Sequence, residues 1–290
     1  MAIVNENYPG KQVNLTDEQL KEIAIQQYQQ QQVQAQVRAG FPTEVIALPS
    51  QGKVYPESNP LSSGQIEMKY MTAREEDILT SANLIKQGVV LDKLMQSLIV
   101  SPIKYNDLVI GDKNALLIAA RILGYGKDYG VEVACPNCGE YIETTVDLTT
   151  LPERHISDAA KMVDANVFEF HLPNSKRIVT FKLLTHGDEK NLTNEIKEIK
   201  KNLKADEAYP ELSFRLKRII LSVDGNSDKQ YISNFVDNEL FAMDSRALRS
   251  HINEISPDQE FKFNFHCSKC NHEEEALEFS IDSTFFWPNT

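Results

Sequence analysis

Four cysteines in two close pairs are the residues of this sequence best suited to chemistry. Cys135 and Cys138 form the first pair and Cys267 and Cys270 the second, each with two residues between the cysteines. Two thiolates at this spacing can converge on one cation from the tip of a β-hairpin, and two such pairs complete a tetrahedral set of zinc ligands. We therefore predict one structural zinc ion (Zn2+) held by all four cysteines.

The stretches around the cysteines indicate a hairpin at each pair. Apolar and polar residues alternate in Val131–Ala134 before the first pair and in Tyr141–Leu148 after it. The second pair lies between Phe261–Phe265 and Ala276–Ile281, which are further strand candidates. Alternation with a period of two is the pattern of a half-buried strand. We expect two strand–knuckle–strand units that share one metal ion.

A long insert separates the two cysteine pairs, from Gly139 to His266. Loop-closure entropy grows only with the logarithm of length, so this insert costs about 2 kcal/mol more than a loop of ~15 residues. Structural zinc contributes about 10–16 kcal/mol in zinc-finger peptides, so the metal outweighs the loop. The cost falls further if the insert folds and brings its own ends together.

Other interpretations of the cysteines stay open at this point. His266 or His272 could replace one sulfur, and the cysteines could also be reduced without metal or paired as disulfides. The start of the chain, Met1–Glu6, lacks the basic residues and apolar stretch of a secretory signal, so a reducing cytoplasm is expected. Four thiolates leave no position for water or substrate, so the predicted site is structural.

The composition is that of an acidic globular protein. The chain has 290 residues, 41% hydrophobic and 25% charged, with a formal net charge of -12. An acidic chain is a poor match for phosphate backbones, so nucleic-acid binding is not expected. No apolar run approaches the ~20 residues that span a bilayer, so membrane insertion is not expected either. The length suggests about two domains.

No other motif has the spacing of a catalytic site. The six histidines form no His-Glu-x-x-His pair, and there is no nucleophile elbow, phosphate loop or dinucleotide fingerprint. Glu75, Glu76 and Asp77 form an acidic cluster, but they fall in the first turn of a predicted helix, where capping and the helix dipole explain them. We expect no enzyme activity and no small-molecule substrate.

The patterns along the chain predict an α+β fold in three parts. Residues 1–40 are a polar, glutamine-rich N-terminal arm. Residues 41–149 together with 259–290 form the main domain, a helical core with two zinc-knuckle hairpins in one zinc-ribbon-like site. Residues 150–258 form an inserted α/β subdomain.

Individual elements follow from periodicity and from capping residues. Thr72 opens a helix in a capping box with Glu75, and Asp244 or Ser245 caps the last helix. Ile66, Met68 and Tyr70 predict a strand whose solvent face carries Glu67 and Lys69. The other predicted elements are a strand at 45–48, helices near 91–100 and 113–123, strands at 167–172 and 177–183, and helices near 188–203 and 212–221.

The aromatic C-terminus has two interpretations. Phe285-Phe286-Trp287-Pro288 contains the one tryptophan of the chain. These side chains either pack into the protein's own core or form an aromatic anchor for a partner, since aromatic residues dominate interface energetics. The sequence leaves both open.

Several stretches together resemble the T-even-like bacteriophage baseplate proteins. In chain order they are Leu48–Pro56, Met71–Thr80, Gly111–Lys113 leading to Arg121–Gly126, the Cys-Pro-Asn-Cys knuckle and the closing Phe-Phe-Trp-Pro. The resemblance covers most of the chain from about residue 41 onward. It rests on the order of these motifs rather than on any one of them.

The resemblance implies a structural subunit or assembly protein of the baseplate hub of a contractile-tailed phage. It implies contacts with other baseplate and tail proteins, with self-association as a further option, and it supports the pairing of the two cysteine knuckles. The expected location is the host cytoplasm during assembly and the virion tail baseplate if the protein stays there. One alternative is a zinc-ribbon module for nucleic acid or transcription, which would need a basic, aromatic-bearing strand face to which only Lys262 and Lys269 point. The other is an unrecognised hydrolase, directed at the cell wall.

Overall fold

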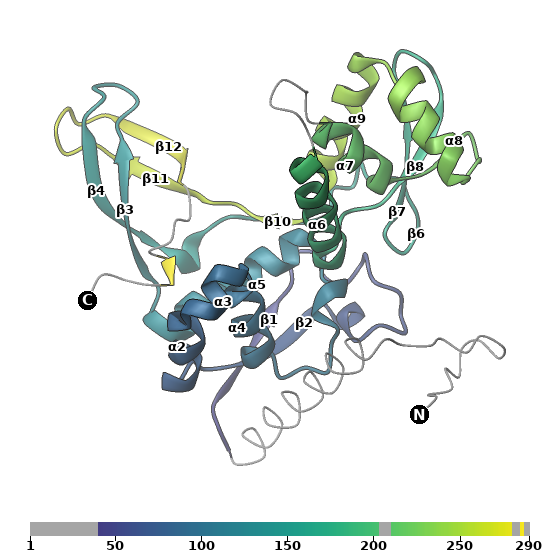
Figure 1. Ribbon diagram of the computed structural model, residues 1–290. Helices are drawn as coiled ribbons and strands as arrows, with labels where there is room; N and C mark the ends of the chain where they lie inside the picture. The colour runs from purple at the N-terminus through teal and green to yellow at the C-terminus, as the bar shows by residue number, and fades with distance from the viewer. Residues whose placement is uncertain (1–39, 203–209, 280–284, 287–290) are drawn as a thin grey trace, which may run out of the picture.

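The computed structural model describes residues 40–202, 210–279 and 285–286, arranged as Figure 1 shows. Of the arm predicted for residues 1–40, only Gly40 lies in the described part. Helices and small antiparallel sheets make up the described chain, which is the α+β class expected from the sequence. Figure 1 shows a helical body, a second group of strands and helices, and a pair of hairpins.

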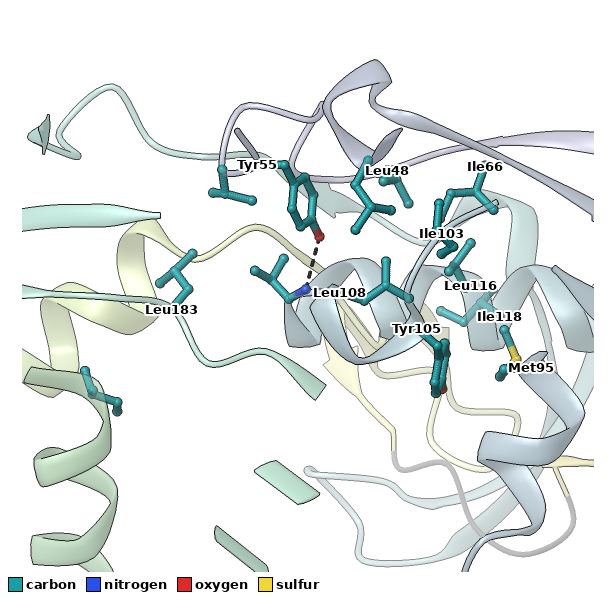
Figure 2. Packing of buried hydrophobic residues seen from close by; sticks show 14 of the residues in the cluster. Leu48, Tyr55, Ile66, Met95, Ile103, Tyr105, Leu108, Leu116, Ile118 and Leu183 are labelled. Atoms are coloured by element: carbon teal, nitrogen blue, oxygen red, sulfur yellow. Dashed lines mark hydrogen bonds between the residues drawn. The ribbon is translucent and has the colours of Figure 1, made fainter. Parts of the chain in front are cut away.

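The helical body is built on one two-stranded sheet. β1 (Thr43–Ala47) pairs with β2 (Gln65–Lys69) in an antiparallel register. Figure 2 shows side chains from the sheet and from two helices gathered in the core, among them Ile66, Met95 and Leu116. The helices of the body are α2 (Ala73–Thr80), α3 (Ala82–Gln87), α4 (Val90–Leu98) and α5 (Ile110–Tyr125), and two 3-10 turns, η1 (Pro60–Ser63) and η2 (Tyr105–Asp107), connect elements.

β2 departs from the predicted alternation at its C-terminal end. Ile66 and Met68 are buried as predicted, but Tyr70 lies beyond the strand and is 36% exposed. Lys69, predicted on the solvent face, is buried, and its ammonium lies 2.8 Å from the Glu75 carboxylate. A buried charge requires such a partner, and hydrophobic alternation does not reveal one.

The single helix predicted from Thr72 onward is divided into α2 and α3. The backbone of Ser81 is extended, with ψ at 104°, and this ends α2. The Thr80 hydroxyl donates to the Glu76 carbonyl, a local bond of the kind that competes with regular helix bonding. The predicted capping box is confirmed, because the Glu75 carboxylate accepts from the Thr72 amide at 3.0 Å.

A buried carboxylate fixes the start of α5. Asp112 accepts hydrogen bonds from the amide and hydroxyl of Ser50 and from the hydroxyl of Tyr55, at 2.9, 2.6 and 2.5 Å. The Tyr55 oxygen accepts in turn from the Val109 amide at 3.0 Å (Figure 2). Burial raises the pKa of Asp112, against the opposing effect of these donors. The network holds the loop between β1 and β2 against α5.

The second group of elements contains a four-stranded antiparallel sheet. Its order is β6 (Met162–Asp164), β7 (Val167–His171), β8 (Ile178–Phe181) and β9 (Ile220–Val223). β7 and β8 occupy the two predicted strands. The helices and the π-helical turn of this group are α6 (His186–Asn202), α7 (Glu211–Ile219), α8 (Lys229–Asn234), η4 (Phe235–Glu239) and α9 (Ala242–Ile255).

Two predicted helix boundaries in this group are wrong. The helix predicted to reach Leu221 ends at Ile219, because the chain continues directly into β9. The last helix is capped by neither predicted residue, since α9 begins at Ala242 after Phe241. Asp244 is buried inside the helix, where its carboxylate accepts from the backbone amides of residues 174 and 175 at 2.7 and 2.9 Å. It therefore joins α9 to the β7–β8 turn.

A short neck brings the two ends of this group together. β5 (Glu153–Arg154) pairs antiparallel with β10 (Asp258–Gln259). The side-chain amide of Gln259 also donates to the backbone carbonyls of residues 151 and 152. The Arg154 guanidinium donates to the Ser256 carbonyl at 2.9 Å. Gly111 of α5 lies so close to the neck that a Cβ there would be 1.8 Å from the Pro257 carbonyl oxygen.

Buried apolar side chains form one continuous cluster through the body and the second group. Leu48 and Leu94 belong to the same cluster as Phe168 and Phe181 of the four-stranded sheet and Phe285 near the C-terminus. The body and the second group therefore share packing rather than meeting only at the neck. None of the helices in the described ranges has the length and apolar character that a membrane crossing requires.

Candidate metal centre

Two antiparallel hairpins project side by side from the helical body (Figure 1). β3 (Asp128–Ala134) pairs with β4 (Tyr141–Asp147), which leads into the 3-10 turn η3 (Leu148–Thr150). β11 (Lys262–His266) pairs with β12 (Glu273–Glu278). The four strands lie where the sequence places the two strand–knuckle–strand units. We call the two hairpins together the hairpin lobe.

β12 differs in detail from its prediction. It begins at Glu273, three residues before the predicted start at Ala276, and the predicted end at Ile281 lies outside the described residues. The pairing with β11 shifts register between Phe263 and Phe265, and Ala276 adopts a left-handed φ of 56°. An extra residue in one strand produces such an irregularity, which alternation in the sequence does not mark.

The two cysteine knuckles have the same backbone geometry. The Cys135 amide donates to the Glu140 carbonyl, and the Gly139 amide donates back to the Cys135 carbonyl, at 2.8 and 2.9 Å. In the second knuckle the Cys267 amide donates to the carbonyl of residue 272, and the amide of Asn271 donates to the Cys267 carbonyl, at the same two distances. The residue after each second cysteine has a positive φ, 74° in one knuckle and 57° in the other. Glycine and asparagine are the residues that tolerate this conformation best, so both sequences suit the turn.

The four sulfurs lie at the spacing that a tetrahedral metal requires. The Cys135 and Cys270 sulfurs are 3.7 Å apart, the Cys138 and Cys267 sulfurs are 3.8 Å apart, and all four lie within 4.8 Å of one another. Zinc–sulfur bonds of ~2.3 Å at tetrahedral angles place sulfurs about 3.8 Å apart. A disulfide needs ~2.05 Å, and all four cysteines are free. The cluster therefore could hold one metal ion.

A small apolar core supports the cluster between the hairpins. Cys135 and Cys267 are buried together with Ile142 of β4 and Phe265 of β11. Cys138, in contrast, is exposed. One cysteine of each knuckle thus lies against this small apolar core.

The protonation of the thiols is uneven across the cluster. Hydrogen bonds from the Asn137 amide and from the backbone at His272 lower the pKa of Cys270 to about 6. A backbone hydrogen bond at Glu140 acts to lower the pKa of Cys138, but partial loss of hydrating water within the cluster and the neighbouring sulfurs raise it to about 12. Four thiolates together repel one another, so a cation that binds here must displace protons from the cluster.

The histidine alternative receives no support from the geometry. The group of ligand atoms close enough to share a metal contains, in the described part of the chain, cysteine sulfurs only. His266 lies 3.6 Å from the Glu273 carboxylate, and His272 lies 3.1 Å from the Glu274 carboxylate. Both rings therefore face glutamates of β12.

Asn137 is a site residue that the sequence argument missed. Its side-chain amide, in the first knuckle, lies 3.6 Å from the Cys270 sulfur of the second knuckle. It is the one side chain of the described residues, other than cysteine, that is hydrogen-bonded to a cluster sulfur. A polar donor between the two cysteines of a knuckle is a signal that could have identified it.

The C-terminal aromatics pack at the base of the hairpin lobe. Phe285 and Phe286 are buried, and the Phe285 ring meets the Tyr129 ring of β3 edge-on, with centroids 5.1 Å apart. Phe279, just after β12, contacts the same tyrosine ring. Phe285 and Phe286 therefore pack into the protein's own core, which is the first of the two interpretations of the C-terminal aromatics. Trp287 and Pro288 lie outside the described residues.

The described chain is an α+β protein in which two matched knuckles bring four cysteines together into a cluster that could hold one metal ion. The chain belongs to the T4 bacteriophage base plate protein family, whose family model matches residues 42–287. No curated protein and no solved structure matches the chain. The match confirms the resemblance to T-even-like baseplate proteins and supports a structural role in the phage baseplate. It gives no support to the nucleic-acid and hydrolase alternatives.

Proposed function

We propose that this protein is a structural or assembly subunit of the baseplate hub of a contractile-tailed phage and acts through protein–protein contacts rather than catalysis. The family match over residues 42–287 is the observation that carries the proposal. Its partners are other baseplate and tail proteins. It assembles with them in the host cytoplasm and remains in the tail baseplate.

Deletion of the gene from the phage tests this role. We expect lysates that contain heads and unattached tail parts but no complete baseplates, because a missing hub protein blocks the assembly that depends on it. Cryo-electron microscopy of tails rescued with the wild-type protein should show its density at the hub. Complete, infectious tails formed without the protein would contradict the proposal.

We further propose that Cys135, Cys138, Cys267 and Cys270 bind one structural zinc ion. The all-sulfur donor set and the sulfur separations of 3.7 and 3.8 Å support it. A tetrahedral set of four thiolates suits zinc or iron. With four protein ligands, zinc keeps no open position, so its contribution is to hold the two hairpins together.

Metal analysis of the purified protein tests the zinc proposal. We expect about one zinc per chain and no visible absorption, whereas iron bound to four thiolates would colour the protein. Cys267→Ser should lose the metal, while Ser268→Ala, an exposed residue of the same knuckle, should keep it. Much less than one zinc per wild-type chain, or stoichiometric iron, would contradict the assignment.

We also propose that residues 150–258 are a subdomain inserted into the main domain, which consists of residues 41–149 and 259–290. The β5–β10 pair supports this division, because it joins the two ends of the insert. It also explains how the long segment between the knuckles avoids a large loop-closure cost. Hydrogen exchange that stays slow in 150–258 after metal removal would support the division; loss of protection there together with the hairpins would contradict it.

A further inference from the structure

β1 is the open edge of the sheet in the helical body. β2 is covered on both sides, by β1 on one side and by the chain at Ile99 and Val100 on the other. The Val100 amide donates to the Glu67 carbonyl at 2.8 Å. The second edge of β1 pairs with no strand in the described residues. An open edge presents unpaired backbone groups to any extended chain that reaches it.

The register identifies which groups of β1 face outward. Hydrogen bonds run from the Leu48 amide to the Gly64 carbonyl and from the Tyr70 amide to the Pro42 carbonyl. In an antiparallel pair the bonded positions alternate, so the intervening residues that bond to β2 are the even-numbered ones, 44 and 46.

Three residues of β1 therefore direct their amides and carbonyls away from β2: Thr43, Val45 and Ala47. Within the described ranges, none of these six backbone groups takes part in a hydrogen bond. The Val45 side chain at their centre is 61% exposed. The strand has no lysine, proline or bulge of the kind that usually protects an exposed edge, and Glu44 is its one charged residue.

A groove of about 410 Å³ runs beside this strand. Four consecutive residues of β1 form one wall, and apolar residues of α5, among them Ile118 and Ile122, line it together with Leu148 and Leu151 beyond β4. Its size lies within the ~300–1,000 Å³ usual for binding pockets. It combines a backbone edge with an apolar surface, which are the two features that strand addition uses.

The charge of the groove specifies the occupant further. Glu44 and Glu153 are its charged lining residues, both exposed, and no lysine, arginine or histidine lines it. The chain as a whole carries a formal charge of -12. A basic segment therefore fits this site better than an acidic one.

We propose that the β1 edge and this groove bind an extended segment of another baseplate protein, which adds as a strand beside β1. The segment carries apolar residues at alternate positions, facing α5, and lysine or arginine near Glu44 and Glu153. Its backbone pairs with the outward groups of Thr43, Val45 and Ala47. The proposal rests on membership of the baseplate family and is independent of the metal site.

Substitution of Val45 tests strand addition directly. Val45→Pro removes the central outward amide but no bond to β2, so the β1–β2 pair should survive. Val45→Thr keeps that amide and the β-branched shape, and serves as the matched control. We expect the Pro variant to keep its melting temperature and metal content but to fail to rescue baseplate assembly in the deletion phage, whereas the Thr variant rescues it.

Binding of a synthetic peptide to the purified protein tests strand addition in solution. The probe is acetyl-Lys-Val-Thr-Val-Thr-Val-Lys-amide, with a version N-methylated at the valines as its control. We expect the purified wild-type chain to bind the probe at least tenfold more tightly than the N-methylated peptide. Val45→Pro and the charge reversal Glu153→Lys should each weaken probe binding about tenfold, and Val45→Thr less than threefold.

Three results would overturn the proposal. One is equal binding of the two peptides, because strand addition needs the peptide amides. Another is full rescue of assembly by a folded Val45→Pro protein. The third is a wild-type dimer in sedimentation that becomes a monomer on Val45→Pro, which would assign the groove to a second copy of this chain.

Discussion

The hairpin lobe and the helical body are stabilised by different means. The body buries a large set of apolar side chains from one sheet and from α2, α4 and α5, including Leu94, Leu98 and Leu116 with no exposed surface. The hairpin lobe has its own buried cluster of only four residues, and two of these are cysteines. The body therefore has an extensive apolar core, whereas the part of the lobe around the cysteines has a very small one.

The difference follows from the size of the sheets. An isolated two-stranded hairpin is marginally stable in water, and the lobe consists of two such hairpins. The β1–β2 sheet is equally small, but helices cover it. Small units without a sufficient core usually depend on a disulfide or a metal. The comparison therefore predicts that metal loss unfolds the lobe and leaves the body folded.

Removal of one cysteine should have the largest effect. Cys267→Ser leaves three sulfurs and an oxygen at the cluster, and we expect loss of the metal together with its contribution to folding, about 10–16 kcal/mol in zinc-finger peptides. Hydrogen exchange should become fast throughout β3, β4, β11 and β12 and stay slow in α4 and α5. Ser268→Ala should change neither. Equal loss of protection in α4 and α5 would contradict the expectation that the body stays folded without the metal.

The buried ion pair gives the converse experiment in the body. Glu75→Gln removes the carboxylate that lies 2.8 Å from the Lys69 ammonium, both being buried. Breaking a buried pair costs about 3–5 kcal/mol, because the remaining charge stays away from water. We expect this loss in denaturant unfolding, with an unchanged metal content. Glu76→Gln changes the exposed neighbour in the same turn, and its free energy of unfolding should lie within about 0.5 kcal/mol of the wild-type value.

The same pair predicts the sign of an acid effect. Burial acts to raise the pKa of Glu75, but hydrogen bonds from Lys69, Thr72 and Ser97 prevail and lower it. A lowered folded-state pKa contributes stability above the unfolded value of about 4.3, and this is lost as the pH falls through the folded value. The wild-type protein should therefore lose more stability than Glu75→Gln below about pH 4.3. Parallel pH profiles would show that this carboxylate is not the group involved.

Substitution of Gly111, where α5 approaches the neck closely, should reduce the stability of the fold by an intermediate amount. A Cβ at Gly111 would lie 1.8 Å from the Pro257 carbonyl oxygen, so Gly111→Ala must move backbone, at a cost of about 1–3 kcal/mol. Gly130 of β3 is the control, because its Cβ would meet open space. Gly130→Ala should be neutral or stabilising by about 0.5–1 kcal/mol. A tolerated Gly111→Ala in thermal unfolding would mean that the neck can shift away from α5.

Local patterns explain which parts of the molecule the sequence could predict. The cysteine knuckles were predictable because each lies within a few residues of its own hairpin, and α4, α5, β7 and β8 follow clear periodicities. The close approach of the four sulfurs confirms that two knuckles far apart in sequence meet. The metal identity stays a prediction.

Contacts between distant segments explain most of the rest. The burial of Lys69 depends on Glu75 reaching it across a turn, and Asp244 is a link to the β7–β8 turn although its spacing suits a helix cap. The neck pairs two strands of only two residues each, at 153–154 and 258–259. Strands this short show no detectable alternation in the sequence. Tertiary contacts of this kind leave no signal in a local window.

The smallest effect expected concerns Asn137, which touches the cluster without being a ligand. Its amide helps lower the pKa of Cys270 to about 6, so Asn137→Ala should raise that pKa and make proton displacement harder. Outer-shell hydrogen bonds change metal affinity by about 10–100-fold; because this donor is exposed, we expect about tenfold, or ~1.4 kcal/mol. Competition with a zinc chelator between pH 5 and 8 would measure it. The variant's curve should shift toward higher pH, and the body should melt at an unchanged temperature, because the proposed metal is expected to stabilise only the hairpin lobe.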